Sequence, residues 1–205
     1  MSYLFLILVG YLLGSLPFGL MAGRLVKGVD VRDFGSGSTG STNVQRTVGT
    51  PAAVVVLLLD TAKSVLAVLL ARLFSDAPGV EVAAALAAIA GHNWPVFIGF
   101  KGGRGIAPGV GGLLILSPVS GLIALAVSLP TIALWRYVSL GSLLGAAAGV
   151  ITLTFLSLVG VEPMVYIWYG AIGLTMVVAR HKDNIERLVR RQEHKLGRPV
   201  ERVEA

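Results

Sequence analysis

The polar side chains that could do chemistry in this chain gather in three short segments, residues 35–46, 91–108 and 180–188. Two of these segments place glycines and cations directly before an apolar stretch, and the third contains histidine, asparagine and arginine. Glycines let successive backbone N–H groups form a concave nest, and the free N–H groups at a helix start attract anions. These residue types therefore predict a site for phosphate or a similar anion.

The first segment reads GSGSTGSTNVQR and leads directly into an apolar stretch. We expect Ser41 or Thr42 to cap the helix that follows, so that its free N–H groups point at the loop. The alternative is a flexible glycine-serine linker, which would have no need of Asn43 and Arg46. The segment therefore assigns anion binding to Gly37, Gly40, Thr42, Asn43 and Arg46.

The second segment has two glycines between two cations, Lys101-Gly102-Gly103-Arg104, shortly before Pro108. Proline is tolerated in the first turn of a helix, so this segment predicts a second anion cradle at a helix start. Its substrate contacts would come from Lys101, Gly102, Gly103 and Arg104. Simple anchoring of the two cations at the cytoplasmic membrane surface is the alternative.

His92 and Asn93 precede this cradle, near the end of an apolar run. Polar groups inside a membrane helix usually face the bundle interior. We interpret both as structural residues that support the cradle, with His92 as a hydrogen-bonded clamp between two helices. Asp60 and Lys63 lie at i and i+3 in another apolar run, and we expect them to form a buried ion pair in which each charge neutralises the other.

The third segment places His181 and Asn184 on one helical face at i and i+3, where both could contact a substrate. A basic amphipathic helix on anionic lipid is the alternative, and it is preferred for Arg190, Arg191 and Arg198. Either Ser139 or Ser142 could also donate to a ligand, and we assign this role to Ser142.

Composition decides the class of protein that carries these segments. Of 205 residues, 55% are hydrophobic and 14% are charged, and the mean hydropathy is +0.80. Nearly half of the charged residues lie in the last 26 positions. Soluble domains carry about 25% charged residues, so the body of the chain is predicted to be a polytopic α-helical membrane bundle, residues 1–180. Residues 181–205 form a basic cytoplasmic tail.

Runs of about 20 apolar residues predict the spans. These are Ser2–Gly23, Val48–Phe74, Val80–Phe100, the two arms of Ile106–Trp135 on either side of Ser117-Pro118, Val138–Val159 and Pro163–Ala179. With seven transmembrane helices, the basic residues of loops 24–47 and 100–105, Arg136 and the tail all fall on one side. The positive-inside rule then places the N-terminus outside and the C-terminus in the cytoplasm.

Metal and cofactor chemistry is not expected. The chain has no cysteine, and no carboxylate cluster suited to Mg²⁺ accompanies the three segments. A transfer between two phosphate-bearing substrates would then rest on positioning and electrostatics.

A transporter for a small phosphorylated anion and a purely structural membrane anchor are the alternative classes of protein. The transporter would place polar groups at mid-membrane and on both faces.

Residues 35–49, 91–109 and 180–195 resemble, in order and spacing, the three signature regions of the bacterial membrane acyl-phosphate:glycerol-3-phosphate acyltransferases, the PlsY family. The resemblance covers essentially the whole chain. Arg104 stands where many members carry lysine, which keeps the charge but changes the donor geometry. Residues 38–41 read Ser-Thr-Gly-Ser, where the family often has Asn, then Pro or Val, Gly and Ala.

The resemblance implies transfer of an acyl group from a fatty acyl phosphate to the sn-1 hydroxyl of glycerol 3-phosphate, giving lysophosphatidic acid and phosphate. It implies a bacterial cell membrane enzyme in phospholipid biosynthesis, with its active site at the cytoplasmic face. A soluble enzyme that produces the acyl phosphate would be a partner, and nucleic acid would not.

Catalysis is then expected from Ser36, His181 and Asn184. Ser36 would donate to the acyl phosphate, while His181 would act either as general base or as a positioning residue. The acyl chain would lie between spans in the lipid phase.

Overall fold

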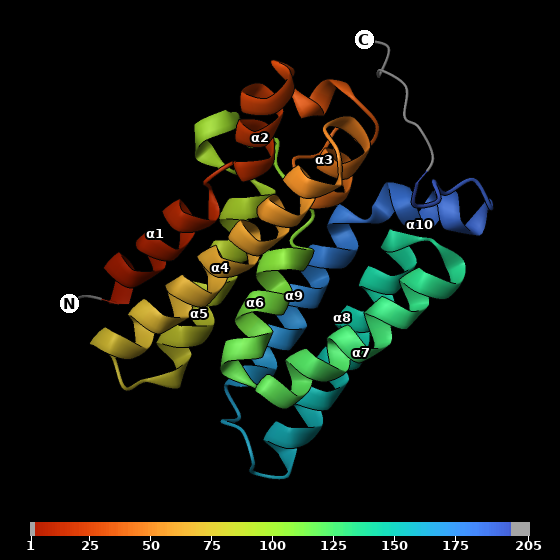
Figure 1. Ribbon diagram of the computed structural model, residues 1–205. Coiled ribbons are helices and arrows are strands. Elements are labelled where there is room, and N and C mark those ends of the chain that lie inside the picture. The colour runs from red at the N-terminus through yellow and green to blue at the C-terminus, as the bar shows by residue number, and fades with distance from the viewer. Residues whose placement is uncertain (1–2, 198–205) are drawn as a thin grey trace.

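The computed structural model describes residues 3–197, which form a bundle of helices (Figure 1). The ten α-helices of this part of the chain are α1 (Tyr3–Gly14), α2 (Phe18–Lys27), α3 (Ser41–Thr47), α4 (Thr50–Phe74), α5 (Pro78–Asn93), α6 (Ile106–Leu116), α7 (Pro118–Trp135), α8 (Val138–Leu158), α9 (Tyr166–Arg180) and α10 (Lys182–Val189). Short 3₁₀ turns occur at Val31–Asp33 and Val96–Ile98. The all-α prediction is confirmed, whereas Arg198 and the rest of the predicted tail to residue 205 lie outside the described residues.

Within residues 3–197, five helical segments are long and apolar enough to cross a membrane: Tyr3–Lys27, Thr50–Phe74, Pro78–Ile98, Pro118–Trp135 and Val138–Leu158. Helices α6 and α9 are shorter. Large apolar side chains lie on the outer surface of the long helices, for example Leu58 and Phe155. In water such a surface would be unfavourable, but lipid tails are themselves apolar, and helices can lie among them because they satisfy their own backbone hydrogen bonds.

Two of the predicted spans contain a helix end that the prediction did not include, and a proline lies at each. The first span was expected to run unbroken from Ser2, which lies outside the described residues, to Gly23. Instead α1 ends at Gly14 and α2 begins at Phe18, because Pro17 has no N–H to donate and clashes with the preceding turn. The third span was expected to reach Phe100, but α5 ends at Asn93, just before Trp94-Pro95, where a residue preceding proline leaves the α region.

The predicted break at Ser117-Pro118 is confirmed. Ser117 ends α6 and precedes α7, and its extended backbone (φ −144°) reverses the chain. Gly121 lies against Leu114, so the two helices fold back on each other. The hairpin leaves α6 only 11 residues long, with its start at the same end of the bundle as α3 and α10 (Figure 1).

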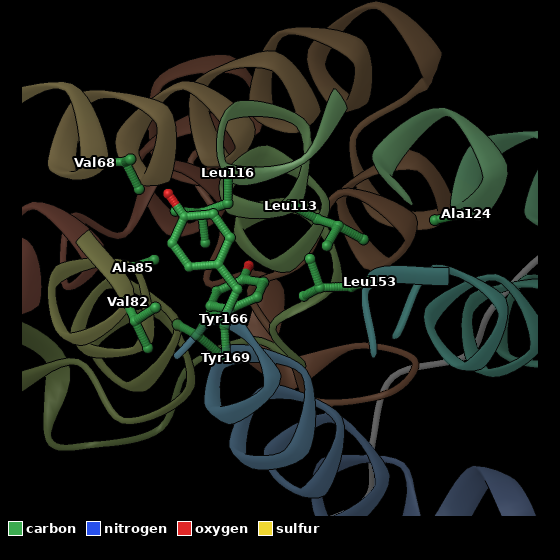
Figure 2. Close-up of a cluster of buried hydrophobic side chains, with 10 residues drawn as sticks. Val68, Val82, Ala85, Leu113, Leu116, Ala124, Leu153, Tyr166 and Tyr169 are labelled. Carbon is green, nitrogen blue, oxygen red and sulfur yellow. The ribbon is translucent and has the colours of Figure 1, made fainter. Parts of the chain in front are cut away.

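A layer of buried apolar side chains, contributed by every helix from α4 through α9, packs together inside the bundle (Figure 2). It consists of Val68, Val82, Ala85, Ile89, Leu113, Leu116, Ala124, Leu153, Tyr166 and Tyr169. Both tyrosines satisfy their hydroxyl groups inside the bundle, as buried tyrosines usually do. Tyr169 donates to the carbonyl oxygen of Gly109 at 2.6 Å, and Tyr166 donates to the carboxylate of Glu81 at 2.8 Å. This layer fixes α6 and α9 relative to α5.

Glycines let α1 approach α5 closely. A Cβ atom on Gly10 would lie 2.6 Å from the carbonyl oxygen of Ala84, and one on Gly14 would overlap that of Ala88. On the other helix, a Cβ on Gly91 would overlap the carbonyl oxygen of Tyr11. Small residues four apart are typical of close helix pairs in membranes. The contact holds the end of α5, with His92 and Asn93, against α1.

We expect Gly14→Ala to lower the free energy of unfolding by about 1–3 kcal/mol, because the added methyl group forces α1 away from α5. Gly79→Ala is the matched control, since its Cβ would meet only the Val165 Cγ2 atom at 3.8 Å. Thermal unfolding in detergent measures both variants. Equal melting temperatures for the two would contradict the close contact.

Candidate active site

The three predicted segments meet at one end of the bundle. Helix α3, the start of α6, the end of α9 and α10 all lie there (Figure 1). Arg46 of α3 donates to the carbonyl oxygen of His194, which follows α10, at 3.3 Å. Segments more than a hundred residues apart in the sequence therefore form one site.

Asn43 organises the first loop from inside. Its side chain is fully buried, and the amide nitrogen donates to the carbonyl oxygens of Val31 at 2.7 Å and Ser38 at 2.9 Å. Its oxygen accepts from the Ser36 backbone N–H at 3.1 Å. These three bonds hold the loop, so Asn43 shapes the predicted cradle from behind.

The expected side-chain cap by Ser41 or Thr42 is wrong. Gly40 occupies the N-cap position of α3, Ser41 is already the first helical residue, and no side chain caps this end. Gly37 is needed in this loop because the residue at this position has a left-handed backbone, with φ 64°, a conformation in which a side chain would be strained. Ser36 and Ser38 lie at its sides with their hydroxyl oxygens 3.3 Å apart.

The second loop rests on the end of α5. The Gly103 N–H donates to the carbonyl oxygen of His92 at 2.9 Å, and a Cβ on Gly103 would overlap the His92 ring. A Cβ on Gly102 would likewise overlap the carbonyl oxygen of His92. Both glycines are therefore required by close packing.

Arg180, at the end of α9, holds the other side of this loop. Its Nε atom donates to the carbonyl oxygen of Gly103 at 3.1 Å, and its guanidinium lies 5.9 Å from the centre of the Trp94 ring. With both contacts, the end of α9 fixes the position of the loop that carries Arg104.

A buried carboxylate stands at the centre of the site. The Glu193 side chain is only 4% exposed, and it accepts from Arg187 Nε at 2.9 Å, Asn184 Nδ2 at 2.7 Å and the Ser139 hydroxyl at 3.1 Å. It therefore joins α8, α10 and the segment after α10. The part of the tail that the structure describes folds over the site through this residue.

Positive charge exceeds negative charge around Glu193. Burial lowers the pKa of Arg46, an effect that Glu193 opposes and Arg187 reinforces. Burial also lowers the pKa of Arg104 to about 10; Glu193 opposes this shift, whereas Arg187, Arg46 and Arg180 add to it. Both guanidinium groups stay charged at neutral pH, so the surroundings of Glu193 carry an excess of positive charge.

His181 is neutral in this setting. The pKa of its imidazole is lowered to about 4, chiefly by burial; the bond to Val177 opposes this shift and the charge of Arg104 adds to it. Its Nδ1 lies 2.8 Å from the carbonyl oxygen of Val177. Because a carbonyl can only accept, Nδ1 carries the proton and Nε2 keeps a lone pair.

Some buried polar atoms of the site have no partner among the described residues. They include Arg46 Nε, a donor, and Asn184 Oδ1, an acceptor, together with both side-chain polar atoms of Asn93. Leaving such atoms unpaired is unfavourable by about 1–3 kcal/mol each. The donor suits a phosphate oxygen and the acceptor suits a hydroxyl group.

The other predicted residues take different places. Lys101 is exposed, and Thr42 is half-buried. Ser142 lines an apolar cavity that begins at Gly105, beside the site, and continues between α6, α7, α8 and α9. Its other lining residues include Val110, Leu113, Ala146, Val150, Tyr169 and Leu174. The bundle thus places an apolar space next to a cationic one.

Sequence reasoning missed Glu193 and Arg180 as site residues, and it assigned no certain role to Ser139. Glu193 was included in the basic tail, although a glutamate among arginines is itself a signal of an ion pair. Arg180 directly precedes His181 and was not given a role of its own. Which serine of α8 faces Glu193 depends on how the tail packs.

Comparisons with known proteins agree with this geometry. A model of the family described as glycerol-3-phosphate acyltransferase matches residues 4–191. The chain is 45% identical over 197 residues to the glycerol-3-phosphate acyltransferase of Parasynechococcus marenigrum (strain WH8102), covering 96% of this chain and 91% of that one. It is 47% identical over 197 residues to the enzyme of Synechococcus sp. (strain CC9902), covering 96% of each.

Two crystal structures of PlsY, an integral membrane glycerol 3-phosphate acyltransferase, have the same fold. They are the glycerol 3-phosphate form, with a TM-score of 0.87, and the lysophosphatidic acid form, with a TM-score of 0.85. Each is 38% identical to this chain and covers 96% of both chains.

The chain belongs to the glycerol-3-phosphate acyltransferase family. The resemblance to the PlsY family is confirmed over nearly the whole length, and this acyltransferase is an integral membrane enzyme. The transporter and structural-anchor alternatives are therefore set aside.

We expect Glu193→Gln to lower kcat/KM at least tenfold and the free energy of unfolding by about 3 kcal/mol, because Arg187 loses its buried counter-charge. Glu186→Gln is the control, since the Glu186–Arg190 pair is more than half exposed on both sides and contributes little. Turnover assays and thermal unfolding of both variants measure the difference. Equal kcat/KM and equal melting temperatures for the two variants would show that the Glu193 carboxylate does not hold the site together.

We expect His181 to remain neutral from about pH 5 to pH 8, since its pKa lies at about 4. Protonation should appear only as the pH falls through that value. The measurement is ¹⁵N NMR of histidine-labelled protein, with the His181 signals assigned from a His181→Ala spectrum. A titration near 6.5 would mean that the ring is not desolvated.

Proposed function

We propose that this acyltransferase moves an acyl group from a fatty acyl phosphate to the sn-1 hydroxyl of glycerol 3-phosphate, giving lysophosphatidic acid and inorganic phosphate. The observation that carries the proposal is the pairing of a buried cationic cluster with an adjoining apolar cavity. A phosphate-bearing acceptor fits the first and an acyl chain fits the second. The two PlsY crystal structures, one the glycerol 3-phosphate form and the other the lysophosphatidic acid form, support the same pair of ligands.

Arg46 and Arg104 would bind the phosphate of glycerol 3-phosphate. Both are charged, and Arg46 Nε has no partner among the described residues. A dianionic phosphate would balance the excess of guanidinium groups that Glu193 alone leaves. Guanidinium groups bind phosphate oxygens in pairs, which also orients the ligand.

Asn184 and His181 would place the glycerol end. The free Asn184 Oδ1 can accept from a hydroxyl group, while its amide nitrogen is held by Glu193 at 2.7 Å. The lone pair of His181 Nε2 can accept from another hydroxyl. Glu193 and the Val177 carbonyl thus orient both acceptors before the substrate binds.

The donor phosphate would lie in the first loop. Ser36 and Thr42 would donate from their hydroxyl groups, the nest around Gly37 and Gly40 would supply backbone N–H groups, and Asn43 would hold the loop in shape. Lys101, Gly102 and Gly103 would complete the cradle beside Arg104, where Lys101 can serve either phosphate. The acyl chain would enter the apolar cavity past Ser142.

The transfer step needs no metal or cofactor. The hydroxyl oxygen attacks the acyl carbonyl carbon, the bond from that carbon to the phosphate oxygen breaks, and phosphate leaves with the electron pair. The hydroxyl proton goes to His181 Nε2 or to a phosphate oxygen of a substrate. The arginines and the loop N–H groups stabilise the charge that develops, which is the usual role of preorganised donors.

Seven transmembrane helices, with the N-terminus outside and the C-terminus in the cytoplasm, would place the site at the cytoplasmic face of a bacterial cell membrane. This side gives access to glycerol 3-phosphate and to a soluble enzyme that supplies the acyl phosphate. Residues 1–180 would be the catalytic bundle and the segment from His181 its cytoplasmic extension.

The test uses purified protein in lipid with palmitoyl phosphate and glycerol 3-phosphate. We expect phosphate release that requires glycerol 3-phosphate, formation of lysophosphatidic acid, and no turnover with palmitoyl-CoA as donor. If His181 is the base, His181→Ala should lower kcat by about 10²–10⁴-fold with little change in the KM for glycerol 3-phosphate.

A change confined to KM would make His181 a positioning residue and leave the proton to a substrate phosphate. Lack of turnover by folded wild-type protein would contradict the acyl-phosphate proposal.

A further inference from the structure

Beneath the second glycine loop, three buried side chains form one polar network. Asp60 and Lys63 come from α4 and His92 from the end of α5, and each residue is at most 6% exposed. Lys63 Nζ lies 2.8 Å from Asp60 Oδ1 and 2.9 Å from His92 Nδ1. The expected Asp60–Lys63 pair is thus confirmed, and His92 joins it as a third member.

The network fixes the tautomer of His92. A charged lysine has three donors and no acceptor, so the short contact between Lys63 and His92 requires a lone pair on Nδ1. Asp60 Oδ1 lies 3.4 Å from the same Nδ1, too far to compete with Lys63 for it. The ring proton is therefore on Nε2, at the opposite side of the ring from the ion pair.

That side of the ring faces the loop. A Cβ on Gly103 would overlap Nε2, so the loop backbone passes directly over this atom. The Gly103 N–H also donates to the His92 carbonyl oxygen at 2.9 Å. The position of the loop, and with it the start of Arg104, is set by where the ring stands.

We propose that Asp60, Lys63 and His92 are a positioning triad: Lys63 holds His92 with its proton on Nε2, and the ring places loop 101–105 for phosphate binding. The proposal rests on the function given above for that loop. Charge neutralisation alone does not account for the arrangement, because Asp60 and Lys63 already pair and Lys63 also donates to the Leu16 carbonyl oxygen at 3.3 Å.

Two substitutions of His92 separate placement of the loop from filling of space. In His92→Gln the amide nitrogen takes the place of Nε2, whereas in His92→Asn it takes the place of Nδ1. We expect His92→Gln to keep the KM for glycerol 3-phosphate within about threefold, and His92→Asn to raise it at least about tenfold. Melting temperatures in detergent identify variants that fail to fold.

The tautomer itself is measured without any turnover. In ¹⁵N NMR of histidine-labelled wild-type protein, assigned with His92→Gln, we expect the His92 proton on Nε2. In Lys63→Met the proton should move to Nδ1, because Asp60 Oδ1 is then the nearest acceptor. The position of the His92 proton is measured without an acyl donor, so this result tests the triad independently of the proposed reaction.

Two results would overturn the proposal. One is a wild-type spectrum with the proton on Nδ1. The other is an equal KM for glycerol 3-phosphate in His92→Gln and His92→Asn at similar melting temperatures, which would make His92 a space-filling residue only. Failure of the wild-type protein to use palmitoyl phosphate would instead contradict the donor assignment and leave the tautomer result intact.

Discussion

The rest of the site depends on an imbalance of buried charge. Arg46, Arg104 and Arg187 all interact with the carboxylate of Glu193, and Arg180 adds a further positive charge near Arg104. Like charges repel strongly where water is scarce, so such a cluster persists only if rigid elements hold it or an anion neutralises it. Here helices from both ends of the sequence hold it, and in the proposed function a phosphate ester would supply the missing negative charge.

The support for this cluster is built mostly from backbone. Gly102 and Gly103 let the loop rest on His92, Asn43 binds the first loop from inside, and Arg180 bonds to the Gly103 carbonyl oxygen. In the proposed reaction, these fixed dipoles and cations would position a donor that already carries a good leaving group.

Hydrophobic runs and prolines predicted much of the fold. The helical class, the hairpin at Ser117-Pro118 and the Asp60–Lys63 pair followed from apolar length, proline and i,i+3 spacing. The breaks after Gly14 and Asn93 were missed, because a run of apolar residues sets how long a span can be and not where its helix ends. Proline decides that locally, and the prediction gave Pro17 and Pro95 too little weight.

The sequence by itself determined which residue types are available for chemistry: glycines, cations, histidine and asparagine in three segments, no cysteine, and too few charges for a soluble body. The tertiary structure decided which of these residues share a site. Asn43 binds its own loop, Lys101 is exposed, and Glu193 and Ser139 come together only because the segment after α10 folds back onto α8. Spacing along a chain specifies neighbours on one helix, whereas contacts between helices depend on how close their backbones pack.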